Sequence, residues 1–74
     1  RPGQTWLQVS AVGRPEAELL VDVLVKKGFR AIIAPGPSEK LFRVLVGPAR
    51  DDAEVVRTRT ELEQSGFRPI PRRY

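Results

Sequence analysis

A short pattern occurs twice in this chain, and it constrains the fold more than any other feature. Gly28-Phe29-Arg30-Ala31-Ile32 and Gly66-Phe67-Arg68-Pro69-Ile70 lie 38 residues apart. Each follows a segment whose apolar residues have helical spacing, and each is preceded by a leucine four residues before the glycine. The repeat predicts two similar halves, each made of a strand, a helix and a second strand.

The first strand is expected from Trp6 to Val12, where apolar and polar residues alternate. The alternation predicts one face made by Leu7, Val9 and Ala11, and an opposite face made by Trp6, Gln8 and Ser10.

Two helices are expected, over 15–27 and 51–65, and each is followed by a glycine that suits a left-handed C-terminal position. The second has a capped start, because Glu54 follows Asp51 by three residues.

Three further strands complete the chain, over 30–35, 41–46 and 68–72. Gly47-Pro48 is expected to end the third strand. The last strand is expected at a sheet edge, because Pro69 and Pro71 lack backbone donors.

The order β-α-β-β-α-β predicts an α+β fold of the split-βαβ type, ferredoxin-like or RNP-like. Its four-stranded antiparallel sheet would have both helices on one face, leaving the other open for function. We expect one domain over 1–74, with a core over about 6–70 and flexible ends at 1–5 and 71–74.

Composition removes several kinds of chemistry. The chain has no cysteine and no histidine, which excludes disulfides, the usual zinc and haem sites, and triads built on histidine. The serines have no histidine to activate them, so we expect no catalysis, no metal and no cofactor. The net charge of +4 indicates an anionic partner. No apolar run is long enough to span a membrane.

Three segments resemble a known family. Leu7-Gln8-Val9-Ser10-Ala11-Val12 is similar to the opening "VQVGSF" strand of SPOR (sporulation-related repeat) domains. Leu24 to Phe29 resembles their "L-x-x-x-G-Y/F" segment, and Phe42 to Pro48 resembles their "YRVxVGP" segment. The similarity extends from about Trp6 to Ile70.

The resemblance implies a non-catalytic module that binds peptidoglycan glycan strands lacking stem peptides. Such modules target division proteins, amidases and lytic transglycosylases of the bacterial envelope, usually in the periplasm. The chain starts Arg1-Pro2-Gly3, and we expect it to be part of a larger envelope protein.

The resemblance also implies a glycan site on the open sheet face. Gln8 and Arg43 match family positions, Ala11 takes the place of a ligand-contacting serine, and Leu41 takes a place that is often aromatic. The chain also departs from the family at three other positions. Ser10 stands where the family usually has a glycine, Val12 where it has a phenylalanine, and Ala49 where it has an aromatic residue. The predicted glycan-binding residues are Trp6, Gln8, Ser10, Ala11, Leu41 and Arg43.

The chemistry of these side chains fits a glycan. The Arg43 guanidinium can hold the free lactyl carboxylate of a muramic acid in two parallel hydrogen bonds. The Gln8 amide can donate to and accept from sugar groups, and Trp6 can stack on a sugar ring. Ordinary alternatives remain: a solvated arginine paired with Glu39, a surface glutamine, and a tryptophan that caps the core.

Two other functions stay open. Leu41 and Leu45 on the open face are either covered or form an apolar strip for a protein partner of a degenerate SPOR-like domain. An RNA-binding domain of RRM type shares the element order, but Phe42 has core parity and leaves the open face of its strand without an aromatic. Nucleic acid is therefore disfavoured. The basic tail residues Arg68, Arg72 and Arg73 would add non-specific attraction to anions.

Overall fold

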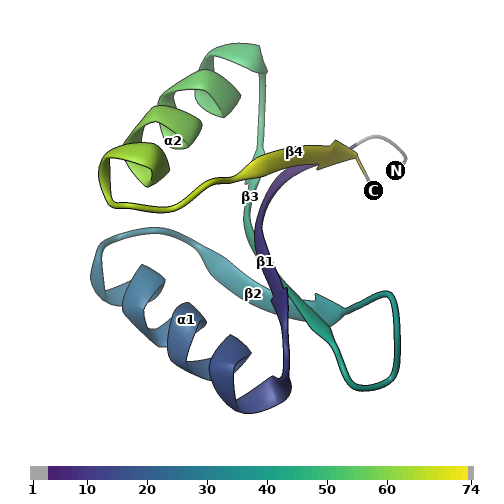
Figure 1. Cartoon of the computed structure of the whole chain (residues 1–74). Coiled ribbons are helices and arrows are strands. Elements are labelled where there is room, and N and C mark those ends of the chain that lie inside the picture. Colours follow the sequence, from purple (N-terminus) through teal and green to yellow (C-terminus); the bar gives the residue numbers. More distant parts are fainter. Residues whose placement is uncertain (1–3, 74) are drawn as a thin grey trace.

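The computed structural model describes residues 4–73. The elements are β1 (Thr5–Val12), α1 (Arg14–Lys26), β2 (Ala31–Pro35), β3 (Phe42–Ala49), α2 (Asp52–Gln64) and β4 (Ile70–Arg73). The strands form one sheet in the order β2-β3-β1-β4, with antiparallel neighbours throughout. Both helices lie on one side of this sheet (Figure 1). The predicted α+β split-βαβ fold is confirmed, and β4 lies at an edge as expected.

The ends of the chain were expected to be flexible over 1–5 and 71–74. The structure places Thr5 in β1 and residues 71–73 in β4. Residues 1–3 and 74 lie outside the described part.

The repeated pattern of the sequence forms the C-terminus of each helix. Gly28 and Gly66 have φ values of 98° and 96°, a region that favours glycine. The N–H group of the following phenylalanine donates to the carbonyl of Leu24 or Leu62 at 3.0 Å in both halves. These are Schellman motifs, and the same two leucines are fully buried. The repeat therefore encodes a helix stop and a core anchor together.

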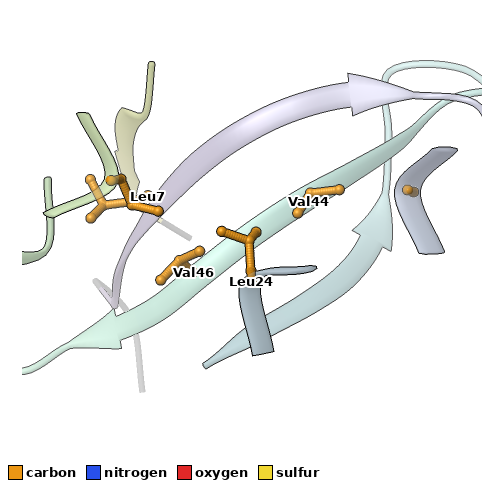
Figure 2. Close-up of a cluster of buried hydrophobic side chains, with 6 residues drawn as sticks. Leu7, Leu24, Val44 and Val46 are labelled. Carbon is orange, nitrogen blue, oxygen red and sulfur yellow. The ribbon is translucent and has the colours of Figure 1, made fainter. Parts of the chain in front are cut away.

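The core lies between the helices and the sheet. Leu7 of β1, Leu24 of α1 and the β3 residues Val44 and Val46 pack together (Figure 2). Ala17 and Leu62 complete the buried cluster. Val12 packs against it, as expected for a residue that replaces a larger phenylalanine.

A β-bulge in β1 overturns the predicted alternation beyond Val9. The register of β1 against β3 shifts between Gln8 and Ser10, so β1 has one extra residue there. Ser10 lies opposite the buried Val44, on the helix side, and Ala11 lies opposite Arg43, on the open face. The prediction had Ser10 and Ala11 on the reverse faces and was wrong for both.

Strand β3 was also predicted incorrectly at both ends. It does not stop at Val46 but continues through Gly47 and Pro48, which are joined by a cis peptide bond, to Ala49. Between Val46 and Ala49, β3 has one residue more than the segment of β1 that pairs with it, Thr5 to Leu7. Leu41 precedes the strand and lies in the β2–β3 turn, where its carbonyl accepts from the Gly36 N–H at 3.1 Å. Leu41 therefore occupies no strand position of the open face.

Candidate functional site

The strand register arranges the side chains of the open face in rows. Residues directly opposite each other on neighbouring strands point to the same face. The open face carries a central row of Ile32, Leu45, Gln8 and Ile70, one flanking row of Ala34, Arg43 and Ala11, and the pair Trp6 and Arg72.

An apolar hollow of about 310 Å³ lies on this face. Leu45 is only 4% exposed, although it faces away from the helices. Trp6, Ile32 and Arg43 line the hollow around it, together with Ala34 and Pro35. Leu45 is therefore too buried to form an exposed apolar strip, and the residues that line the hollow around it come from β1, β2 and β3.

Arg43 is held at the wall of this hollow. Its Nη1 donates to the Pro35 carbonyl of the neighbouring strand at 3.3 Å. Arg43 lines the apolar hollow, and its guanidinium brings a positive charge to this wall. The strand pairing and this hydrogen bond place a cation beside an apolar floor, which suits a ligand with both a carboxylate and apolar C–H groups.

The structure brings four of the six predicted site residues to one face. Trp6, Gln8 and Arg43 lie there as predicted, and Ala11 joins them because of the bulge. Ser10 does not share this face, and Leu41 lies in the turn before β3.

Sequence reasoning missed the contributions of the two edge strands. Ile32 and Ala34 of β2 line the hollow, and Ile70 and Arg72 of β4 extend the face beyond Gln8 and Trp6. All four residues from Ala31 to Ala34 are apolar, so no alternation in the sequence assigns Ile32 and Ala34 to the open face. The β4 residues were also not predicted, because only the register of this short strand decides which of its side chains lie on the open face.

Negative charge is concentrated on the helix side of the domain and in the β2–β3 loop, whereas basic residues occur on both sides. Eight of the nine acidic residues belong to α1, α2 or the N-cap of α2, and the ninth, Glu39, lies in the β2–β3 loop. The four strands contain no acidic residue, whereas arginines at 43 and 72 stand on the open face. In residues 4–73, the ion pairs join side chains within or next to the helices. The strand residues of the open face therefore contribute only positive charge, which favours an anionic ligand.

A smaller hollow, of about 200 Å³, lies on the helix side between β3 and α2. Glu54 at its wall accepts from the Arg50 N–H at 2.6 Å and lies 3.9 Å from the Arg57 guanidinium. The Arg50 hydrogen bond, with the positive charges of Arg50, Arg57 and Arg30, lowers the pKa of Glu54 below its ordinary value of 4.5. On this side of the domain, Arg50 and Arg57 therefore both pair with Glu54.

Phe42 packs against the core, as its parity predicted, and Arg14 lies over its ring at 5.7 Å. The β3 aromatic is therefore turned away from the open face, which lacks the stacking arrangement of RRM domains. Within residues 4–73, no cluster of three or more acidic, histidine or cysteine side chains is placed to hold a metal ion. No helix in the same range is long and apolar enough to cross a membrane.

Comparison with known protein families identifies this arrangement. The SPOR domain family matches residues 2–73, essentially the whole chain. Comparisons with curated proteins and with solved structures find no match. SPOR domains are peptidoglycan-binding modules of the bacterial cell envelope and are binding domains rather than enzymes. The family match, the confirmed fold and the basic open face agree, and the chain belongs to the SPOR domain family.

Proposed function

We propose that this domain binds peptidoglycan glycan strands that lack stem peptides, and that the strand lies across the open sheet face. The observation that carries the proposal is the position of Arg43. Its guanidinium is held by the Pro35 carbonyl at the wall of an apolar hollow, on a face whose strands carry no acidic residue.

Removal of the stem peptide creates the group that Arg43 would recognise. In an intact strand the lactyl carboxyl of muramic acid is consumed in an amide bond to the peptide. Amidase cleavage of this bond frees a carboxylate, which a guanidinium can bind by charge-assisted hydrogen bonds. Selectivity for stripped strands then follows from charge and from the absence of the bulky peptide.

The apolar part of the hollow suits the C–H faces of sugar rings. Trp6 and Ile32 line the hollow around the buried Leu45, and Gln8 lies directly opposite Leu45 on β1. An amide beside an apolar floor can donate to and accept from the N-acetyl and hydroxyl groups at the edges of a ring. Ala11, opposite Arg43, supplies only a methyl group at that position.

The proposed role is targeting. A non-catalytic module that recognises stripped glycan would bring a larger envelope protein to division or remodelling sites, where amidases act. The periplasm is the compartment in which this ligand is present. The domain needs no cofactor for binding of this kind.

Two exposed isoleucines favour one alternative, a protein contact through the same face. Ile32 is 44% exposed and Ile70 is 53% exposed, at opposite ends of the central row. Exposed aliphatic side chains on both edge strands are common at protein interfaces. This alternative would use the isoleucines rather than Gln8 and Arg43.

The test is a pull-down of the chain on purified sacculi, intact and amidase-treated. Binding should rise after amidase treatment and fall in the double variant Gln8→Ala with Arg43→Ala. The matched control is Gln64→Ala with Arg59→Ala, which removes the same two residue types from exposed positions on α2. Equal loss in both variants, or no preference for treated sacculi, would refute the proposal. No binding of the folded wild-type domain to either preparation would favour the protein-contact alternative.

A further inference from the structure

Two adjacent arginines of β4 point to opposite faces of the sheet. Arg72 lies opposite Trp6 in the β1–β4 pairing, and Arg73 lies opposite Thr5. Trp6 lines the hollow of the open face, whereas Thr5 shares the helix side with the buried Leu7, two residues along β1. Arg72 is therefore on the open face, and Arg73 is not. Both are exposed and have the same charge.

Arg72 lies on the edge strand β4 and Arg43 on the inner strand β3, toward opposite ends of the open face. Strand β1 lies between β3 and β4, so the two arginines are separated by about 10 Å across the sheet. Their β1 partners, Trp6 and Ala11, are five positions apart with a bulge between them, which adds about 13 Å along the strand. The two side chains leave the sheet too far apart to serve the same sugar unit.

A stripped glycan strand offers a matching ligand. Its free carboxylates are not clustered but recur once in each disaccharide along an extended polymer. Two cations toward opposite ends of a face whose described strands carry no acidic residue are complementary to such a ligand, whereas one cation would suffice for a single muramic acid. The apolar hollow, lined by Arg43 and by the Arg72 neighbour Trp6, joins the two arginines and can accommodate the intervening sugars.

We infer that Arg72 is a second carboxylate-binding residue, so that one domain engages two muramic acid units of the same strand. This inference rests on the proposed function and deepens it. It assigns to Arg72 a specific role that Arg73 does not share, in place of the non-specific attraction expected of a basic tail. It also predicts that affinity increases with glycan length beyond one disaccharide.

The experiment measures affinity by calorimetry for peptide-free glycan oligomers with one, two and three muramic acid units. The proteins are the whole chain and the variants Arg72→Gln and Arg73→Gln, which have the same net charge. Wild type should gain affinity between one and two units. Arg72→Gln should lose about three- to tenfold on the longer oligomers and little on the shortest. Arg73→Gln should retain the gain with length.

A second ligand separates a carboxylate contact from general attraction. The two-unit oligomer with its lactyl carboxyls amidated should bind wild type and Arg72→Gln with similar affinity. NMR spectra of the three proteins should be recorded first, to check that each variant is folded.

The outcomes separate this inference from the proposed function. If wild type binds the oligomers but Arg72→Gln and Arg73→Gln behave alike, the two-carboxylate inference is overturned and the glycan function stands. If wild type binds no oligomer of any length, both are overturned. If Arg72→Gln weakens the amidated oligomer as much as the free acid, Arg72 does not recognise carboxylate, which also overturns the inference.

Discussion

Ala11 lies directly opposite Arg43 in the β1–β3 pairing, on the open face of the sheet. The bulge between Gln8 and Ser10 creates this relationship, because without the extra residue Ala11 would point toward the helices. The resemblance to SPOR domains places a ligand-contacting serine at this position. The structure therefore puts a methyl group next to the principal cation of the candidate site, where a hydroxyl is expected.

Restoring that hydroxyl should strengthen glycan binding. Ala11→Ser adds a donor and acceptor beside Arg43 without a large change in volume, and one hydrogen bond contributes about 0.5–1.5 kcal/mol. We expect roughly two- to tenfold higher affinity for stripped glycan, measured by calorimetry.

The neighbouring Ser10→Ala is the control, because Ser10 lies opposite the buried Val44 and not on the open face. It should leave glycan affinity unchanged. An Ala11→Ser domain that binds no better than wild type would show that this position does not contact the ligand.

The sequence was sufficient for the fold but not for the faces of β1. Helical spacing, the Gly-Phe repeat and the Asp51 cap identified both helices, because these are local signals. A bulge depends on pairing with β3 and leaves no mark in a simple alternation. One sign was present: Val12 is apolar but falls on the polar side of the predicted alternation, and in the structure it packs against the core. The edge contributions of Ile32 and Arg72 required the strand register.

The start of α2 depends on the Asp51 side chain. Its carboxylate accepts from the Glu54 N–H at 2.8 Å, as the capped start predicted. Asp51→Ala should lower the free energy of unfolding by about 1 kcal/mol, measured by urea denaturation. Asp51→Asn keeps an acceptor at the cap and should recover most of the loss. If Asn destabilises as much as Ala, the cap hydrogen bond is not the cause.

Glu54 should make the domain sensitive to acid. Its side chain is 17% exposed and accepts from the Arg50 N–H, with Arg50 and Arg57 nearby. Because its pKa is lowered on folding, its ionised form stabilises the folded state fully above about pH 4.5, and this contribution is lost as the pH falls through the lowered value. Thermal unfolding from pH 7 to pH 3 should show a smaller acid-induced drop in Tm for Glu54→Gln than for wild type.

Glu54→Gln should also begin from a lower Tm at neutral pH, because it weakens the contacts with Arg50 and Arg57. Glu63→Gln, near the other end of α2, controls for the removal of one carboxylate from the helix. An unchanged acid dependence in Glu54→Gln would assign the acid sensitivity to other groups.

The hollow on the helix side should be a packing defect that a larger residue can fill. Ala49 lines it beside Phe29 and Thr58, and the resemblance places an aromatic residue at this position. Ala49 lies opposite Thr5, whose face is that of the buried Leu7, so a longer side chain at 49 would extend toward α2 and away from the glycan face. Ala49→Phe should therefore stabilise the domain by about 0.5–2 kcal/mol in urea denaturation and leave glycan affinity unchanged.

Ala53→Phe, at an exposed position of α2, is the control and should give no such gain. A loss of stability in Ala49→Phe would mean that the space is too small for the ring, whereas a change in glycan affinity would mean that the two sides of the sheet are coupled through β3.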